Sequence, residues 1–135
     1  MRIDPYLAFN GNCSEAIALY EKAFNSKASE VMRHGDAPPS EGYTPAPGTE
    51  NLIMHATIPV GESGLMVCDS PGETYNFGNG GASFHVAMDD EDCLKAAFDI
   101  LKEGGTVEMA PEKTFWSNCF CSLTDKFGVW WMLSV

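Results

Sequence analysis

The order of predicted elements repeats along the chain, and this repeat restricts the fold more than any other feature. A strand, an amphipathic helix and three more strands occur twice, with helix starts near residues 12 and 90, about 78 residues apart. One helix covers only one face of a small sheet, and a second such unit is the most economical cover for the other face. The sequence therefore predicts an α+β fold, in which two βαβββ modules form a curved mixed-sheet cup with the helices on its outer face.

The first module is expected at about residues 1–70 of a single domain, residues 1–135. Asn12 is a suitable helix N-cap, and Glu15 three residues later predicts a capping box. Apolar side chains then recur at helical spacing and form a stripe of Ile17, Tyr20 and Phe24. Strands are predicted at residues 3–9, 29–33, 52–60 and 65–68.

The second module is expected at about residues 80–135 and repeats this order. Asp89 and Asp90 begin its helix, because the helix dipole favours acids in the first turn, and Gly104 ends it. The apolar stripe of this helix consists of Leu94, Ala97, Phe98 and Leu101. Strands are predicted at residues 82–88, 106–109, 115–123 and 129–133.

Two long segments rich in glycine separate these elements. Residues 34–51 contain four prolines and three glycines, a density that the interior of neither a helix nor a sheet tolerates. Connections of this length are usually functional or disordered, so we expect a role over the cup or at a dimer contact. Residues 69–81 are the best candidate for the linker between the modules.

The chain is strongly acidic, with 8 Lys and Arg against 19 Asp and Glu and a net charge of −11. Such a surface repels phosphate backbones and anionic lipid headgroups, so we expect neither nucleic acid nor a membrane as partner. No apolar run approaches the roughly 20 residues of a membrane helix, and the N-terminus has no apolar signal core. A cytoplasmic location is the default expectation.

Five cysteines are present, and no two of them have Cys-x-x-Cys spacing; they are Cys13, Cys68, Cys93, Cys119 and Cys121. Cys13 and Cys93 each stand at a predicted helix start, where the thiol pKa can be lowered and the thiol made reactive. The alternative is that the cysteines are reduced, mostly buried thiols that act as small hydrophobic side chains. We favour this second interpretation.

Several segments, in this order, resemble the vicinal-oxygen-chelate (glyoxalase/bleomycin resistance/dioxygenase) superfamily, and its PhnB-like branch above all. The most specific are Phe115 with Trp116 and the Asp-x-x-Gly that precedes the last strand, which is Asp125 to Gly128 here. The other matching segments are residues 5–11, 15–24, 53–56, 65–69 and 129–132. Together they cover nearly the whole chain.

The resemblance implies two paired modules around a half-open cup that holds a ligand or a metal. Metal-dependent members place His and Glu on the first and last strands of both modules, and those positions fall here on Asp4, Met66, Ser83 and Met132. Thioethers and a hydroxyl are poor ligands for the usual divalent metals, so we expect no metal and no cofactor. PhnB-like proteins are often labelled methyltransferases, but the sequence has no glycine-rich strand-turn-helix for S-adenosylmethionine.

Strand alternation, in the phase that the resemblance sets, predicts an apolar and aromatic cup. The expected ligand-binding residues are Tyr6, Met66, Cys68, His85, Trp116, Trp130 and Met132. Trp116 and its neighbour Phe115 line the rim of this cup or, alternatively, plug an aromatic core. Trp130 and Trp131 must point to opposite faces of the last strand, so that one packs on a helix.

The three histidines differ in what their positions predict. His85 is the best candidate for a general base or ligand contact, although the catalytic residues are otherwise unknown, and its alternative is a histidine satisfied by hydrogen bonds within the sheet. His55 falls on the opposite alternation from Met54 and Ala56, which predicts a place between sheet and helix or against a partner subunit. His34 opens the long loop and is expected to be solvated.

These observations favour a PhnB-like protein of unassigned reaction that binds a small, partly apolar molecule in a metal-free cup. The alternative is a metal-dependent lyase, isomerase or dioxygenase of the same superfamily with a nonstandard site, such as His85 with Cys68. A homodimer is also expected, because sheet faces that carry Tyr6, Met66 and Trp130 expose apolar surface, and the long linkers allow exchange between chains.

Overall fold

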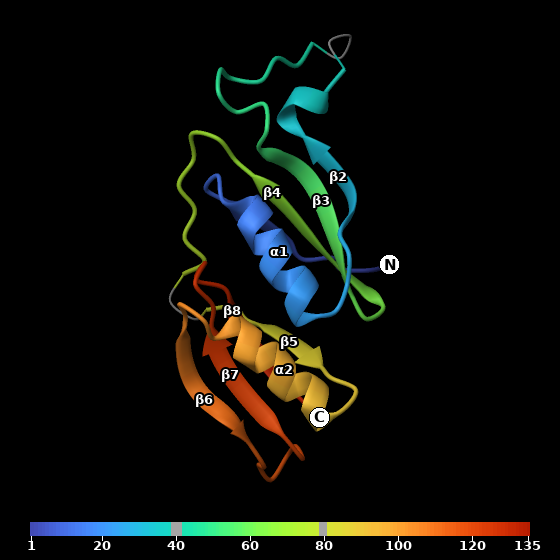
Figure 1. The fold of residues 1–135 in the computed structure, drawn as a ribbon, viewed down its shortest axis with the longest axis vertical. Coiled ribbons are helices and arrows are strands. Elements are labelled where there is room, and N and C mark those ends of the chain that lie inside the picture. The colour runs from blue at the N-terminus through green and yellow to red at the C-terminus, as the bar shows by residue number, and fades with distance from the viewer. Residues whose placement is uncertain (39–41, 79–80) are drawn as a thin grey trace. The chain divides into compact units, whose positions relative to one another are not determined.

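The two predicted βαβββ modules are present in the computed structural model, which describes residues 1–38, 42–78 and 81–135 (Figure 1). The chain divides into two compact units, Met1–Tyr75 and Asn76–Val135. Each unit contains one strand, one helix and three further strands, in that order. The α+β class and the repeated order of elements predicted from the sequence are therefore confirmed.

The first unit is a four-stranded mixed sheet with one α-helix. The first strand, β1, runs parallel to the last strand, β4, while the other neighbours are antiparallel, and the sheet order is β1-β4-β3-β2. Tyr6 on β1 lies opposite Met66 on β4. The elements are β1 (Tyr6–Phe9), α1 (Cys13–Ala23), β2 (Ser29–Arg33), the short 3-10 helix η1 (His34–Asp36), β3 (Ile53–Val60) and β4 (Ser63–Asp69).

The second unit has the same topology, with sheet order β5-β8-β7-β6 and a parallel pair formed by its first and last strands. His85 on β5 lies opposite Met132 on β8, which is the register position that Tyr6 and Met66 hold in the first unit. The elements are β5 (Phe84–Ala87), α2 (Glu91–Leu101), β6 (Thr106–Glu112), β7 (Phe120–Thr124) and β8 (Trp130–Ser134).

Several predicted boundaries need correction. The strand predicted from residue 3 begins only at Tyr6, directly after Pro5, whose ring removes a backbone donor. The strand predicted at residues 115–123 begins only at Phe120, whereas the one predicted to end at Met109 continues to Glu112. The loop predicted at residues 34–51 starts with η1, and its residues 39–41, like residues 79–80 of the predicted linker, lie outside the described residues.

Each helix covers one face of its own sheet (Figure 1). Strand alternation directs Leu7, Phe9 and Val67 of the first sheet to the covered face, where they are at most 6% exposed. The predicted stripe of α2, made of Leu94, Ala97, Phe98 and Leu101, is buried in the same way. The core of each unit therefore lies between a single helix and one side of a sheet.

Both α-helices have 11 residues, which spans about 17 Å at 1.5 Å per residue. In the part of the chain that the structure describes, no helix is long and apolar enough to cross a membrane.

The first helix begins differently from the predicted capping box. The side chain of Asn12 caps no backbone N–H, and its Oδ1 atom is buried without a hydrogen-bond partner. The carboxylate of Asp69, from the end of β4, takes this role instead and accepts hydrogen bonds from the backbone N–H groups of Gly11 and Cys13 at 2.9 and 3.0 Å. At α2 the cap is local, because the side chain of Asp90 accepts a hydrogen bond from the backbone N–H of Cys93 at 2.8 Å.

Asp69 connects three elements of the first unit. Only 3% of the residue is exposed, and its second carboxylate oxygen accepts a hydrogen bond from the backbone N–H of Ile53 at 2.9 Å. One buried charge therefore fixes the end of β4 to the start of α1 and to the start of β3. Hydrogen bonds to a charged group contribute about 1.5–3 kcal/mol each, so Asp69 has a large share in the stability of this unit.

The Asp-x-x-Gly segment before the last strand has a comparable role in the second unit. Asp125 accepts hydrogen bonds from the backbone N–H groups of Phe127 and Val129 and from the indole N–H of Trp131. Gly128 closes the turn at a φ of +91°, in the left-handed region that favours glycine. The motif therefore has a structural role, because Asp125 connects the tight turn to the buried indole of Trp131 on β8.

We predict that Asp69→Asn lowers the free energy of unfolding by about 2 kcal/mol, because the neutral amide keeps one acceptor oxygen and loses the charge. Urea unfolding followed by circular dichroism measures the change. Glu62→Gln, at an exposed position in the β3–β4 turn, is the matched control and should change the value by less than about 0.5 kcal/mol. Equal values for the two variants would contradict the proposed role of Asp69.

Candidate functional site

Each sheet has one side that its helix leaves uncovered, and we call that side the open face. On the first sheet, Leu7, Ala56 and Val67 are buried on the side of α1, so their neighbours along each strand point the other way. The open face of the first sheet carries Tyr6, His55, Thr57, Met66 and Cys68. Tyr6 is 51% exposed and the others are half-buried.

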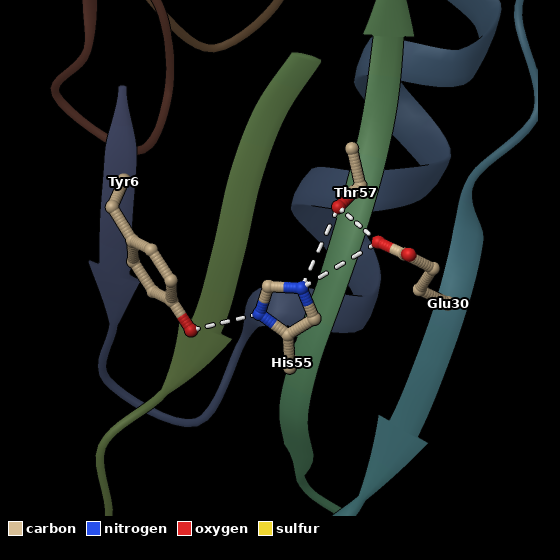
Figure 2. A network of polar contacts seen from close by, with 4 residues as sticks. All are labelled: Tyr6, Glu30, His55 and Thr57. Atoms are coloured by element: carbon tan, nitrogen blue, oxygen red, sulfur yellow. Dashed lines mark hydrogen bonds and ion pairs between the residues drawn. The ribbon is translucent and has the colours of Figure 1, made fainter. Parts of the chain in front are cut away.

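Four polar side chains form a connected network on this open face, with α1 behind the sheet (Figure 2). The hydroxyl of Tyr6 lies 3.0 Å from Nδ1 of His55. The other ring nitrogen, Nε2, lies 3.5 Å from Oγ1 of Thr57 and 3.9 Å from Oε2 of Glu30. Thr57 in turn donates its hydroxyl proton to Oε2 of Glu30 at 3.0 Å. The network therefore joins strands β1, β2 and β3.

The partners of His55 determine which nitrogen carries the proton in the neutral ring. Thr57 has a single hydroxyl proton and gives it to Glu30, so both oxygens near Nε2 can only accept. Nε2 is therefore the protonated nitrogen, and Nδ1 accepts the hydrogen bond that Tyr6 donates. The imidazole of His55 thus lies between the hydroxyl of Tyr6 and the carboxylate of Glu30. Sites that transfer protons commonly place a base between a hydroxyl and a third group that orients the base.

Desolvation, and then the neighbouring thiol of Cys68, raise the pKa of Tyr6 to about 12. The neutral phenol is consequently the form present throughout the physiological pH range, and Tyr6 acts as a hydrogen-bond donor and acceptor there. Its exposed position leaves this hydroxyl accessible on the open face.

The position of Glu30 in this network depends on an irregularity in β2. Between the pairs Ser29–Thr57 and Met32–His55, the chain advances three residues on β2 but only two on β3, so one extra residue forms a bulge. Glu30 within it has a φ of +54°, a left-handed conformation that costs a residue other than glycine about 1 kcal/mol. Bulges redirect side chains and are common next to active sites.

The open face of the second sheet combines Met132 with two polar pairs. Nε2 of His85 lies 2.7 Å from Oγ of Ser134, and the indole N–H of Trp130 donates to Oγ of Ser122 at 2.8 Å. His85 is exposed and lies opposite Met132. The structure thus places His85, Trp130 and Met132 on one face, while Tyr6, Met66 and Cys68 share the open face of the other unit.

The aromatic residues near the C-terminus divide between surface and core. Trp131 is 2% exposed and stacks near Phe84, with ring centroids 5.4 Å apart, whereas Trp130 points to the open face. The predicted division of the two indoles is therefore confirmed. Phe115 and Trp116 are 97% and 57% exposed and meet edge to face at 4.7 Å, so the alternative of a buried aromatic plug is wrong.

The prediction of a solvated His34 was wrong, and one of the two alternatives for His55 is excluded. His34 is only 8% exposed, with Nε2 donating to the backbone carbonyl of Asp69 at 3.1 Å and Nδ1 bonded to the hydroxyl of Tyr43. His55 does not pack between sheet and helix, because Ala56 occupies that side with 0% exposure. Sequence reasoning gave His55 a structural place and did not identify Thr57 or Glu30 as its partners, although alternation of His55 with the apolar Ala56 was a usable signal for its side of β3. Glu30 belongs to β2, where a bulge interrupts the alternation.

The cysteines are free thiols, of which Cys13, Cys119 and Cys121 are buried. Burial, and then Asp69, raise the pKa of Cys13, while burial raises the pKa of Cys121 to about 11. At the start of α2, the hydrogen bond and charge of Asp90 raise the pKa of Cys93. Neither helix start therefore lowers the pKa of its thiol, which is the effect that the alternative of a reactive cysteine invoked.

The positions that hold metal in relatives do not supply a suitable donor set here. Asp4 precedes β1 and its carboxylate pairs with Arg2 at 2.8 Å, while Ser83 precedes β5. The sheet positions themselves hold the thioethers of Met66 and Met132, which bind zinc or manganese poorly. Among the described residues, no group of three or more His, Cys, Asp or Glu side chains could hold a metal ion.

A fold of two βαβββ modules with a mixed sheet in each defines the class of protein to which the chain should be compared. The sequence profile of the Glyoxalase/Bleomycin resistance protein/Dioxygenase superfamily matches residues 2–133. The chain therefore belongs to this superfamily, and its relatives include a PhnB protein.

Three relatives match over nearly the full length of both chains. Protein YjdN of Escherichia coli (strain K12) is 34% identical and is matched over 100% of this chain and 95% of its own. Protein PA1353 from Pseudomonas aeruginosa is 36% identical, with a TM-score of 0.83 and coverage of 99% and 96%. A structure from Bacillus cereus named as a putative 3-demethylubiquinone-9 3-methyltransferase, PhnB protein, is 27% identical, with a TM-score of 0.79 and coverage of 99% and 98%.

We predict that Glu30→Gly is more stable than Glu30→Ala by about 1 kcal/mol, because glycine adopts a φ of +54° without the steric cost that a Cβ atom brings. Both variants lose the same carboxylate, so their difference isolates the backbone strain. Thermal unfolding of the two variants side by side provides the measurement. If Glu30→Ala were as stable as Glu30→Gly, the bulge would not be strained.

Proposed function

We propose that the protein binds a small, partly apolar organic molecule on the open faces of its sheets, without a metal ion. The observation that carries the proposal is the composition of these faces, in which a central methionine is surrounded by aromatic rings and a few hydrogen-bonding groups. Met66 is flanked by Tyr6 and Thr57, and Met132 by His85 and Ser122. Binding sites for small molecules typically combine apolar walls with a small number of polar groups.

Exposure supports the same interpretation. Tyr6 and Trp116 are 51% and 57% exposed, and aromatic side chains in water are costly unless a ligand or partner covers them. The polar groups of the open faces already have partners within their own sheets, such as His55 for Tyr6 and Ser134 for His85. A ligand can therefore cover apolar surface here and exchange only a few hydrogen bonds.

Metal-dependent chemistry of the superfamily is less well supported. It would need imidazole and carboxylate ligands where this chain has Met66 and Met132. Methyl transfer, the activity named for the relative from Bacillus cereus, would need a site for a methyl donor, and the sequence contains no glycine-rich strand-turn-helix of the dinucleotide-binding type. Binding remains the function that the residues of the open faces favour.

We expect Met66→Ala and Met132→Ala each to weaken binding of an apolar ligand about fivefold, because each removes roughly 1 kcal/mol of apolar contact. Saturation-transfer NMR with a library of aromatic fragments identifies ligands, and titration of the hits gives the dissociation constants. Leu19→Ala is the matched control, because it removes a half-buried apolar side chain from α1 and not from a sheet. Hits whose affinity changes only in Leu19→Ala would refute the assignment of the open faces.

We also propose that the chain forms a homodimer, since the exposed pair of Phe115 and Trp116 offers apolar surface for association. The net charge of −11 opposes association, but salt screens surface charges beyond about 10 Å. Light scattering at micromolar concentration should report twice the chain mass of 14.7 kDa. Trp116→Ser should shift the equilibrium toward monomer, and a wild-type mass of one chain would exclude the dimer.

A further inference from the structure

The hydroxyl of Tyr6 is exposed on the open face of the first sheet, yet its proton is already in use. With neutral His55, the hydroxyl donates to Nδ1 at 3.0 Å, so that only its lone pairs face outward. A ligand oxygen brought to this position would meet lone pairs, and binding would require the internal hydrogen bond to break. In this state, the face disfavours ligands that carry an anionic oxygen.

Protonation of His55 reverses the direction of this hydrogen bond. An imidazolium has two N–H donors, so Nδ1–H then donates to the hydroxyl oxygen of Tyr6 while Nε2–H stays directed at Glu30 and Thr57 (Figure 2). The phenol O–H must turn away from the ring, where it can donate either to the neighbouring Cys68 or to a ligand on the open face. One proton on His55 therefore converts Tyr6 from an acceptor into a donor toward the ligand.

We propose that the open face of the first sheet binds organic anions with an apolar body, such as aryl carboxylates, and that Tyr6 donates a hydrogen bond to the anionic oxygen while His55 takes up one proton. The inference deepens the proposed function, on which it rests. No covalent bond of Tyr6 is broken: the proton comes from solvent, binds Nδ1 of His55, and is released when the ligand leaves.

Charge supports this assignment despite the acidic surface of the chain. Glu30 lies 3.9 Å from Nε2 on one side of the ring, and an oxygen held by Tyr6 would lie about 5 Å from Nδ1 on the other side. The imidazolium thus stands between two negative groups and attracts both. Glu30 lies on the Nε2 side of the ring and accepts the hydroxyl proton of Thr57, and it is therefore a positioning residue in this site.

The bulge in β2 is an independent observation in favour of the site. The extra residue interrupts the regular strand alternation of β2. Glu30 lies within this irregularity and has a strained φ of +54°. Strained residues persist where the surrounding structure enforces them, and they cluster at functional sites. The bulge lies where the carboxylate of Glu30 approaches His55, and strand pairing alone does not require such an irregularity.

The ionisable groups around His55 are few and come from three strands. Tyr6 belongs to β1, Glu30 to β2 and Cys68 to β4, whereas α1 lies on the opposite face. Of these types of side chain, only histidine ordinarily changes its charge between about pH 6 and pH 8. His34 and His85 lie outside this network, so a change of ligand affinity within this window reports on His55 where His55→Gln abolishes it.

The test compares 2-naphthoate with its neutral counterpart 2-naphthamide by isothermal titration calorimetry. A carboxylic acid of this kind stays ionised above about pH 5, so only the protein changes charge in the window. We expect 2-naphthoate to bind about tenfold more tightly at about pH 6 than at about pH 8. The neutral amide should bind equally at both values. Titrations near pH 7 in buffers with different heats of ionisation should show uptake of part of one proton for the carboxylate alone.

Variants assign the effect to residues. Tyr6→Phe and His55→Gln should each abolish both the proton uptake and the pH dependence, while binding of 2-naphthamide persists. Glu30→Gln should reduce the proton uptake, because the protonated ring loses its carboxylate partner. Tyr75→Phe removes a phenol that is 41% exposed outside this network and is the matched control. Urea unfolding of every variant confirms that the fold is retained.

The outcomes separate the two proposals. Proton-coupled binding of 2-naphthoate that disappears in Tyr6→Phe supports this inference. Binding of both probes without proton uptake, or proton uptake that persists in His55→Gln, overturns it and leaves the proposed function standing. Failure of both probes and of the fragment library to bind overturns the proposed function, and this inference with it.

Discussion

The structure depends on one constraint, which is that each four-stranded sheet has a single helix to cover it. α1 and α2 each bury one face, and the buried residues alternate with side chains that must point away from the helix. The covered face can be filled with aliphatic and aromatic side chains in the ordinary way. The open faces carry methionine, tyrosine, histidine and cysteine side chains, which are the groups available to bind a ligand.

The parts of the fold that depend on local pattern were predictable from the sequence. Helical spacing of apolar residues identified both helices, and alternation placed Met132 on one side of β8 and Trp131 on the other. The positions of Met66 and Tyr6 followed in the same way, because their strands are short and regular. Periodicity within one element shows which residues share a face, and the family resemblance supplied which of the two faces is the open one.

The remaining errors concern interactions between elements distant in the sequence. Asp69 caps a helix that begins 56 residues earlier in the chain, and no local pattern shows that a carboxylate will replace Asn12. The side of β3 on which His55 lies was left open between the helix and a partner subunit, because the apolar residues around it fit either phase of a strand. Glu30 reaches the network only through a bulge in β2. One extra residue in a strand reverses the side of the sheet to which every later side chain of that strand is predicted to point.

The two modules share a backbone plan but differ in the chemistry of their open faces. At the position opposite the central methionine, the first sheet has Tyr6 and the second has His85. Both pair a hydroxyl with an imidazole: Tyr6 donates toward His55 on β3, whereas His85 contacts Ser134 on β8.

Among the described residues, an ion pair to the imidazole is found only in the first of these pairs, where a strained residue in a bulge brings Glu30 to the ring. The polar character of this face is therefore set by the local departure from regular β structure, while the fold sets which residues can share it.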